Sequence, residues 1–396
     1  MRALIAVDAQ LYRLKDGSVW TPSIYGYDFW KRYLEVFDSV VVAARIMDVE
    51  DIRIVKNYLR SDGKAVSFAA LPFARGAKQY IQKWFRFMHS ASKACENIQC
   101  AVIRLPSIPA SFIEHYIWKK GIPYVMEVVV DPQNAYPRGV IRKLLTGHLK
   151  KTVMRANGVS YVTQFALQKY YPCYASIHGE DRYHFESYYS TIVLKKDYFS
   201  SARDYHKHSG PYKIIHVANN MNNDIKGHDV LIKAVAKLRS CGQNVTVCFV
   251  GDGTKRGEFE HLVGELGIQD FVEFTGLLPS TEKVREKLIE SDLFVFPTKA
   301  EGLPRVIIEA MAVGLPCIST PVNGIPELLD DEFLLEPTDV DAFAEKIKVM
   351  ISSPEKMNSC SVRNIAKAKE YEELKLQKRR NAFYSQLISL VKSELT

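Results

Sequence analysis

Short apolar runs alternate with helical patterns between residues 212 and 319, and this alternation is the strongest constraint on the fold. Apolar runs rich in Val, Ile and Phe predict strands at 212–217, 245–250, 272–275, 293–296 and 315–319. Between them, the spacing of apolar residues predicts helices over 229–240, 258–266 and 283–289. Strands and helices that alternate at this length are typical of a parallel, doubly wound α/β sheet.

The first half of the chain alternates in a similar way. Apolar runs predict strands over residues 1–8, 40–44, 65–70, 100–105, 124–129 and 158–163. A chain of 396 residues is too long for a single core, so we expect two domains. A polar stretch at 195–213 is the expected linker. The predicted domains are therefore residues 1–205 and 206–370, followed by a charged, helix-like tail at 371–396.

The composition is that of an ordinary soluble globular protein, with 47% hydrophobic and 25% charged residues. No apolar run approaches the length of about 18 residues that a transmembrane helix needs. The apolar stretch at the start is too short for a signal peptide and is expected to be a strand. The seven cysteines are scattered without a C-x-x-C pattern, which favours reduced core residues in a cytoplasmic protein.

Two glutamates eight residues apart, Glu301 and Glu309, mark the most informative part of the second half. Glu301 lies in the loop that follows the predicted strand 293–296, and Glu309 lies two turns into the next helix. Pro304 suits the first position of that helix, and Gly314 suits its end. Open α/β sheets bind ligands at the carboxyl ends of their strands, and free N–H groups at a helix start favour an anion such as a diphosphate. Glu309 by itself would be read as an exposed helix charge.

The whole run from Phe294 to Thr320 resembles the E-x7-E signature of the retaining GT-B glycosyltransferases of family four, the former group 1 transferases. Both glutamates, the Glu-Gly-Leu-Pro loop, the Glu-Ala-Met-Ala helix and the later Gly-Ile-Pro-Glu at 324–327 occur in the family's order. The resemblance implies a GT-B fold, with two Rossmann-like domains that face a cleft. It also implies an N-terminal acceptor domain, a C-terminal nucleotide-sugar domain and a terminal helix that crosses back to the N-terminal domain.

The same resemblance assigns residues to the donor. Glu309 is expected to bind the ribose hydroxyls, and Glu301 is expected to bind the sugar and take part in catalysis. Further donor contacts are expected from the loops that carry Gly302, Leu303, Pro304, Gly276, Leu277, Asn323 and Gly324.

Lys226 is the predicted cation for the diphosphate. It resembles the Lys-Gly of the family's Gly-Arg-Leu-x-x-x-Lys-Gly segment, but the usual Gly-Arg-Leu reads Ala218-Asn219-Asn220 here. The family's arginine is therefore missing, which leaves Asn219, Asn220 or Arg305 as replacements; the alternative for Lys226 itself is a solvated loop lysine. No Asp-x-Asp lies in a convincing loop and no His/Cys ligand spacing is present, so we expect no metal and no other cofactor.

Two N-terminal residues complete the predicted site. Gly26 stands where the family has a glycine-rich turn after the first strand, and there it would approach the donor phosphate. Asp131 follows the strand 124–129, where many family members have a histidine. We expect Asp131 to contact the acceptor or to polarise its hydroxyl; the alternative is a turn residue before Pro132.

Basic segments suggest a further partner, and the net charge of the chain is +8. Residues 75–93 and 138–155 contain no acidic residue and interleave lysines and arginines with apolar side chains. They are predicted to form basic amphipathic helices that lie on an anionic membrane surface, or alternatively solvated helices packed on the sheet. No nucleic-acid-binding motif accompanies the charge, so we expect no nucleic-acid partner.

These features predict a retaining, metal-independent glycosyltransferase. It would move a sugar from a nucleotide-diphosphate sugar to a saccharide or lipid-linked saccharide during surface polysaccharide biosynthesis, in the cytoplasm or at the inner face of the membrane. Two alternatives stay open: a nucleotide-sugar epimerase of the same fold, and a catalytically inactive nucleotide-sugar-binding protein.

Overall fold

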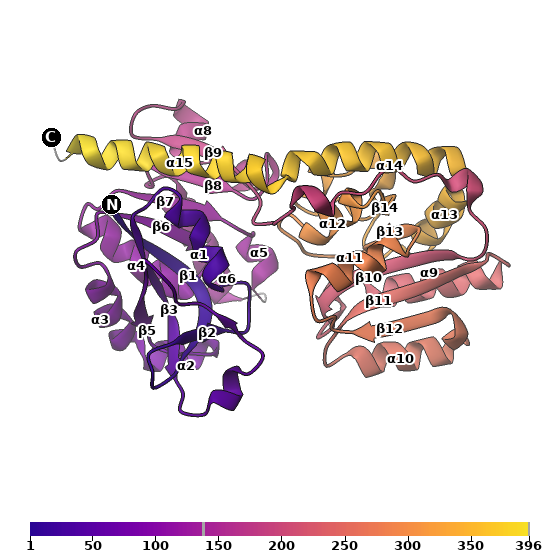
Figure 1. Cartoon of the computed structure of the whole chain (residues 1–396), viewed down its shortest axis with the longest axis horizontal. Coiled ribbons are helices and arrows are strands. Elements are labelled where there is room, and N and C mark those ends of the chain that lie inside the picture. Colours follow the sequence, from indigo (N-terminus) through magenta and orange to yellow (C-terminus); the bar gives the residue numbers. More distant parts are fainter. Residues whose placement is uncertain (137–138, 395–396) are drawn as a thin grey trace. The chain divides into compact units, whose positions relative to one another are not determined.

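The computed structural model describes residues 1–136 and 139–394, and the chain forms two compact units (Figure 1). Unit 1 comprises Met1–Tyr189 with Gln377–Thr396, and unit 2 comprises Ser190–Leu376. Unit 1 thus ends earlier than the predicted boundary at residue 205. The reason is that the following segment bonds into unit 2: the Ser200 amide donates to Ala312 O at 3.1 Å, and the Tyr205 hydroxyl donates to Asp292 O at 2.7 Å.

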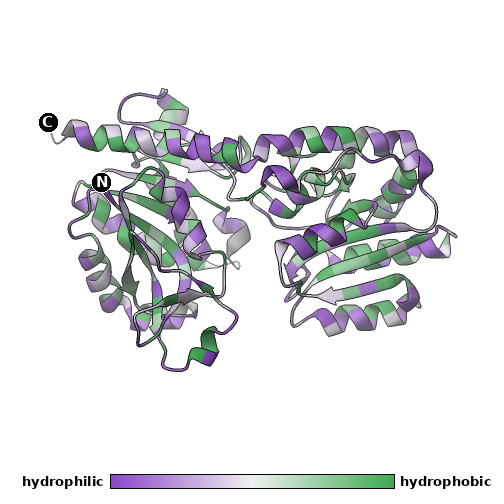
Figure 2. Ribbon diagram, viewed as in Figure 1, coloured by the Kyte–Doolittle hydropathy of each residue, from purple (hydrophilic) through white to green (hydrophobic). Residues whose placement is uncertain are grey.

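Unit 1 is built on a sheet with a parallel centre. Among the described residues, parallel strands follow the order β5-β3-β1-β6-β7-β8-β9. Their bounds are β1 Arg2–Arg13, β3 Ser39–Asp48, β5 Val66–Leu71, β6 Cys100–Leu105, β7 Tyr124–Val128, β8 Gly158–Tyr161 and β9 Phe185–Tyr188. Two short strands, β2 (Val19–Thr21) and β4 (Leu59–Arg60), pair in antiparallel fashion beside the end of β1. The central strands are almost continuously apolar because helices bury both of their faces (Figure 2).

Helices connect the strands of unit 1 and supply the rest of its core. They are α1 Tyr27–Leu34, α2 Gly76–Gln82, α3 Trp84–Ala94, α4 Ile108–Lys119, α5 Pro132–Ala135, α6 Val140–Val153, α7 Ala166–Tyr170 and α8 Tyr174–His178. The basic segment 75–93 forms two helices, since the backbone at Lys83 leaves the helical region at φ −101° and ψ 12°. The basic segment 138–155 forms α6, and its first residue, Arg138, lies outside the described residues.

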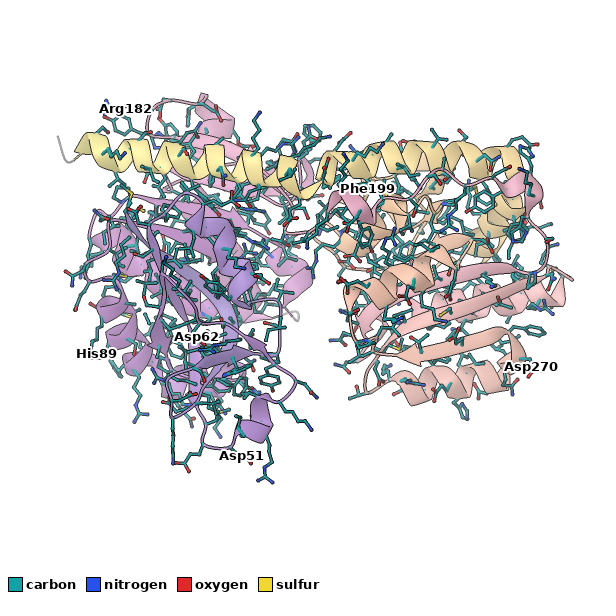
Figure 3. The ribbon with its side chains drawn as sticks, in the orientation of Figure 1. Asp51, Asp62, His89, Arg182, Phe199 and Asp270 are labelled. Carbon is teal, nitrogen blue, oxygen red and sulfur yellow. The ribbon has the colours of Figure 1, made fainter. Side chains whose placement is uncertain are left out.

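Unit 2 is a smaller parallel sheet with the strand order β12-β11-β10-β13-β14 among the described residues. Its strands are β10 Tyr212–Asn220, β11 Val245–Asp252, β12 Val272–Gly276, β13 Leu293–Val295 and β14 Cys317–Ile318. Its helices are α9 His228–Ser240, α10 Arg256–Glu265, α11 Thr281–Ile289, α12 Arg305–Ala312, α13 Val340–Ile351 and α14 Pro354–Ala368. Apolar side chains fill the layers between helices and sheet, while charged residues such as Asp270 lie at the surface (Figure 3).

The last helix, α15 (Glu373–Glu394), begins in unit 2 and then packs on unit 1. Its Tyr384 is fully buried and its hydroxyl donates to the Glu127 carboxylate on β7. Glu127 also forms a buried ion pair with Arg104 and accepts from the Tyr189 hydroxyl at 3.2 Å. Because a buried carboxylate is costly unless it is paired and hydrogen-bonded, this cluster fixes the position of α15 on unit 1.

The seven cysteines are free in the structure, and five of them are buried. Burial raises the pKa of the Cys95, Cys100 and Cys248 thiols to about 12, so these groups are protonated and unreactive. None of the helices in the described residues combines the length and the apolar character needed to span a bilayer.

Candidate functional site

Three loops of unit 2 meet at the carboxyl edge of its sheet, because β10, β13 and β14 are parallel neighbours. The loop after β10 is tied to the loop after β13, where the Lys299 amide donates to Ile225 O at 2.7 Å. The loop after β13 is tied to the loop after β14, where the Gly324 amide donates to Gly302 O at 3.0 Å. Residues that are about a hundred positions apart in the chain are therefore held together at one edge.

Lys226 and Glu301 form an ion pair at this edge. Their side chains are 26% and 15% exposed, so the pair is partly desolvated and still reachable from solvent. The Lys226 ammonium also donates to Ala300 O at 3.4 Å, and the Thr298 hydroxyl donates to the Glu301 carboxylate at 3.4 Å. The structure thus brings the predicted cation and the first predicted glutamate into direct contact.

Gly227 explains why the loop after β10 can approach so closely. Its φ is +73°, and a Cβ atom there would lie 2.1 Å from the carbonyl oxygen of Pro297. Any other residue would therefore push apart the two loops that carry Lys226 and Glu301.

Glu309 lies on α12 and is partly buried. Burial raises the pKa of its carboxyl group, and the positive charge of Arg305 opposes this shift. Within the described residues no hydrogen bond or ion pair engages this carboxylate, although Tyr198 is close enough for the Glu309 charge to help raise the pKa of its phenol. A partly buried carboxylate that lacks a donor is an available acceptor for hydroxyl groups.

The loop that precedes α12 is ordered by its own backbone and by Asn323. The Asn323 side chain donates to Glu301 O at 2.5 Å from a left-handed backbone conformation with φ +46°. Gly302 and Leu303 are buried, and Arg305 is exposed. Pro304 is the N-cap of α12, not its first helical residue as predicted, because its ψ of 109° is extended.

The other predicted donor residues are spread along the same edge. Asn219 and Asn220 are exposed at the end of β10. Gly276 ends β12, which is two strands away from β10 in the sheet, and Leu277 beside it is 62% exposed. Gly251 lies on β11, the strand between β10 and β12, and has no room for a side chain, since a Cβ atom there would lie 1.8 Å from Ala218 O. The Gly-Asp-Gly turn at 251–253 therefore packs against the loop after β10.

The two predicted N-terminal residues lie in unit 1. The Asp131 carboxylate caps α5 by accepting from the Gln133 amide at 2.8 Å, and the Tyr171 hydroxyl donates to it at 2.5 Å. Asp131 is 6% exposed, and its structural role is to cap α5. Its contact with an acceptor stays a prediction. Gly26 does not directly follow the first strand, because β2 intervenes; it is the N-cap of α1 with an ordinary φ of −69°.

Two buried histidines near Lys226 were not predicted to take part in the site. His216 on β10 and His228 at the start of α9 are fully buried, with ring centroids 4.3 Å apart. Burial lowers the pKa of His216 to about 4 and that of His228 to about 2, so both rings are neutral. The neutral His216 ring donates from Nε2 to Lys226 O at 2.8 Å and so holds the backbone of the predicted cation. A histidine in an apolar strand gives no such signal in the sequence, because its partner is a distant backbone carbonyl.

Residues 200–367 match the family described as Glycosyl transferases group 1. Most of unit 2 is therefore similar to the group 1 glycosyltransferases. The matched residues include every predicted donor residue of unit 2, whereas Gly26 and Asp131 lie outside them.

Relatives extend the similarity over most of the chain. Protein CapJ of Staphylococcus aureus is 27% identical over 336 residues, which cover 83% of this chain and 81% of that protein. The putative colanic acid biosynthesis glycosyltransferase WcaL of Escherichia coli K12 is 33% identical over 146 residues, or 35% of each chain. These similarities agree with the family resemblance predicted from the motifs.

Solved structures show the fold of the chain. Anabaena Alr3699/HepE in complex with UDP and glucose is similar with a TM-score of 0.68 at 17% identity, over 97% of this chain and 99% of that one. Sucrose-phosphate synthase from Thermosynechococcus elongatus is similar with a TM-score of 0.70 at 15% identity, over 98% and 99%. The GT-B fold with two Rossmann-like domains is thereby confirmed.

Proposed function

We propose that this glycosyltransferase moves a sugar from a nucleotide-diphosphate sugar to a hydroxyl of a saccharide or lipid-linked saccharide, with retention at the anomeric carbon. The observation that carries the proposal is the arrangement at the carboxyl edge of unit 2. There the Lys226–Glu301 pair lies in the loops beside α12, and α12 carries the carboxylate of Glu309, which has no hydrogen-bond or ion-pair partner among the described residues. A cation and two carboxylates match the diphosphate, sugar and ribose of such a donor.

Each charged side chain then has one role. Glu309 accepts from the ribose hydroxyls, because it has no donor of its own among the described residues. Lys226 binds the diphosphate, and this contact competes with its ion pair to Glu301. Glu301 in turn becomes available to accept from the sugar hydroxyls. Arg305 is exposed in the first turn of α12 and is one candidate to replace the family's missing arginine, beside Asn219 and Asn220.

The proposed reaction replaces one bond at the anomeric carbon by another on the same face. The bond from this carbon to the diphosphate oxygen breaks, the acceptor oxygen forms the new bond, and the leaving diphosphate takes the acceptor's proton. Catalysis is then mostly a matter of position and of charge stabilisation by Lys226. We propose that no metal ion takes part, so activity should persist in EDTA; loss of activity in EDTA that magnesium or manganese restores would contradict this.

Two relatives support the donor and the pathway. HepE was solved with UDP and glucose, which fits a nucleotide-sugar donor for this chain as well. WcaL is named for colanic acid biosynthesis, which fits assembly of a surface polysaccharide.

The deciding experiment has two stages. A thermal-shift screen of nucleoside diphosphates should identify one base that raises the melting temperature, because a ligand that binds only the folded state stabilises it. The matching nucleotide sugars are then tested with saccharide and lipid-linked acceptors, and the anomeric configuration of the product is determined. An epimerised free sugar nucleotide would indicate an epimerase, and binding without any turnover would indicate an inactive binding protein.

We further propose that unit 1 lies on an anionic membrane surface. The exposed side chains of Lys143, Lys150 and Lys151 lie on α6, and each lysine near such a surface contributes about 1 kcal/mol. Sedimentation with anionic liposomes should therefore weaken at high salt, and replacing these lysines by glutamate should abolish it. A protein that ignores anionic liposomes at low salt would favour a soluble acceptor.

A further inference from the structure

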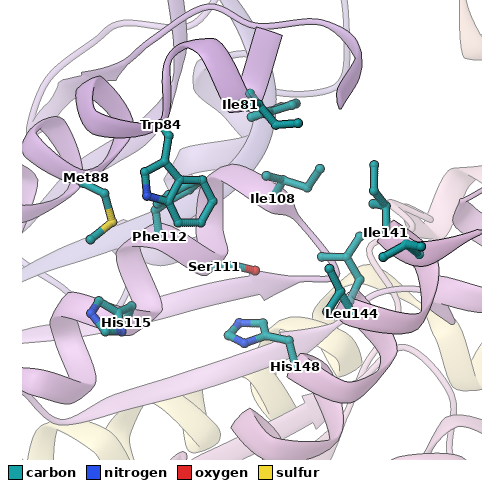
Figure 4. A pocket seen from close by; sticks show the side chains of 13 residues that line it. Ile81, Trp84, Met88, Ile108, Ser111, Phe112, His115, Ile141, Leu144 and His148 are labelled. Atoms are coloured by element: carbon teal, nitrogen blue, oxygen red, sulfur yellow. The ribbon is translucent and has the colours of Figure 1, made fainter. Parts of the chain in front are cut away.

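Helices α2, α3, α4 and α6 of unit 1 surround an apolar groove of about 590 Å³ (Figure 4). Trp84 and Phe112 form one side of the groove, where their rings meet edge to face at 4.7 Å, and Ile141 and Leu144 of α6 form the other side. This volume falls within the range of about 300–1,000 Å³ that is typical of small-molecule sites.

The groove is open to solvent, although its walls are apolar. Ile81 is 74% exposed, Leu144 is 66% exposed and Trp84 is 50% exposed. Polar groups are few in the lining, and burial lowers the pKa of one of them, His148, to about 4, so its ring is neutral at pH 7. Contiguous exposed apolar surface of this kind marks an interaction site in a soluble protein.

The helices around the groove carry exposed charges of one sign. Segments 75–93 and 138–155, which supply α2, α3 and α6, contain no acidic residue. Their exposed cations include Lys78, Lys143 and Lys151, and Lys151 is close enough to His148 in the lining to help lower the pKa of that ring. The acidic side chain on α4, Glu114, is 1% exposed and accepts from the Tyr124 hydroxyl at 3.0 Å. Its carboxylate also lies 3.7 Å from Nε2 of His148, so it is buried behind the lining and not at the surface.

We infer that this groove holds the hydrocarbon chain of an anionic lipid, whose phosphate binds the surrounding lysine and arginine side chains. A second copy of the chain fits less well, because it would bring the same cationic helices face to face. The inference rests on the proposed function in one respect only, because that function identifies the lipid as the anchor of the acceptor. Lipid binding itself is measurable without any transfer reaction.

Chain length gives the sharpest test, because each buried methylene contributes about 0.8 kcal/mol, or about fourfold in affinity. Isothermal titration calorimetry of the whole protein with monomeric octyl phosphate and decyl phosphate should give a Kd at least about tenfold lower for the decyl compound. Inorganic phosphate should bind far more weakly than either, and an uncharged decyl glycoside should bind more weakly than decyl phosphate.

Two matched variants separate the groove from a general surface effect. Leu144→Glu places a charge in the groove, and Val362→Glu places the same charge on α14 of unit 2, where Val362 is 59% exposed. Both sites are exposed, so both variants should fold, which circular dichroism checks. Leu144→Glu should lower the affinity for decyl phosphate at least about tenfold, and Val362→Glu should leave it unchanged.

The outcomes are distinct. Equal affinities for octyl and decyl phosphate, or wild-type affinity in Leu144→Glu, would overturn the inference. Analytical sedimentation gives a further outcome. If the wild type is a dimer, and Leu144→Glu dissociates this dimer while decyl phosphate does not, the inference is overturned and the groove is assigned to self-association. The nucleotide thermal shift should be the same in Leu144→Glu and the wild type, so a failure of lipid binding leaves the proposed donor site standing.

Discussion

Lys226 donates to Glu301, so a diphosphate that binds Lys226 must compete with a carboxylate that is already in place. The backbone of Lys226 is fixed independently of this pair, because His216 donates to its carbonyl oxygen. The ammonium group can therefore change partner while the loop keeps its position. This separation of backbone and side-chain contacts lets single substitutions test the individual roles.

Glu309→Ala should weaken binding of the preferred nucleoside diphosphate about 10- to 100-fold, because a charged acceptor worth about 1.5–3 kcal/mol is lost. Isothermal titration calorimetry measures the change. Glu345→Ala on α13, where the side chain is exposed, is the matched control and should bind like the wild type. Unchanged affinity in Glu309→Ala would rule out the ribose assignment.

Glu301→Ala should reduce turnover and sugar selectivity more than it reduces binding of the bare nucleoside diphosphate. The carboxylate is assigned to the sugar, which a nucleoside diphosphate lacks. Steady-state transfer kinetics beside calorimetry give both quantities. If both fall by the same factor, the proposed division between Glu301 and Glu309 fails.

Lys226→Ala should reduce transfer strongly, because no arginine stands where the family has one beside this lysine. Lys233→Ala, on an exposed position of α9, serves as the control in the same transfer assay. Near-wild-type transfer by Lys226→Ala would move the diphosphate contact to another cation, with Arg305 as the first candidate.

The buried histidines predict a loss of stability in mild acid. His216 and His228 have pKa values lowered to about 4 and about 2 in the folded chain, so below about pH 6.5 the unfolded chain binds more protons. Stability is therefore complete above pH 6.5 and falls as the pH drops toward 4, by up to about 1.4 kcal/mol per pH unit for each histidine. Denaturant unfolding between pH 7 and pH 5 measures the slope. His228→Phe, which keeps the stacking on Phe259, should make it shallower; an unchanged slope would show that His228 does not titrate on unfolding.

At the level of helices and strands, α15 shows how a polar contact can fix the position of an apolar element. Its Phe383, Tyr384, Leu387 and Leu390 are buried on unit 1, and the Tyr384 hydroxyl reaches Glu127. The Glu127–Arg104 pair is buried, and Glu127 also accepts hydrogen bonds from Tyr33 and Tyr189. A slide of α15 along unit 1 would break this hydrogen bond at Glu127, so the cluster determines its register.

Tyr384→Phe should destabilise unit 1 by about 1.5–3 kcal/mol, because it removes a hydrogen bond to a buried charge while it keeps the ring. Thermal unfolding followed by calorimetry gives the change. Tyr170→Phe on α7 is the control, since Tyr170 is 51% exposed, and it should unfold like the wild type. Equal stability of Tyr384→Phe and wild type would show that packing alone holds α15.

Local pattern predicted most of the elements, and the misses have physical causes. The run 100–105 became β6 with the same bounds, and 229–240 became α9 with one residue added. The strands β2 and β4 were missed because two or three residues carry no periodicity and depend on pairing with the end of β1. The Lys226–Glu301 contact agrees with the motif, but the support from His216 is a contact through space that no spacing in the chain encodes.

On the scale of the whole molecule, the chain passes from unit 1 to unit 2 after Tyr189 and returns after Leu376. Unit 2 is one continuous segment, whereas unit 1 is made of two segments that are separated by all of unit 2. The predicted donor residues are all in unit 2 except Gly26. The stability of the two units and the binding of the nucleotide should therefore be separable by truncation.

A chain that stops at Leu376 should keep nucleotide binding and lose the stability of unit 1. Without α15, the apolar surface of unit 1 that packs on Tyr384 becomes exposed to solvent. The Glu127 carboxylate also loses its hydrogen bond from the Tyr384 hydroxyl. Differential scanning calorimetry, with and without the nucleoside diphosphate found in the screen, distinguishes the two transitions. A truncated protein in which unit 1 melts like the wild type would show that α15 contributes little to that unit.

The order of synthesis gives the returning helix another consequence. Residues 377–394 leave the ribosome only after all of unit 2 has been made, so unit 1 cannot complete its fold before unit 2 has been synthesised. During that interval residues 377–394 do not yet pack on the surface of unit 1 near Glu127 and Arg104. A premature stop codon anywhere in unit 2 therefore leaves the N-terminal unit incomplete as well, and such fragments are expected to be targets for chaperones and proteases.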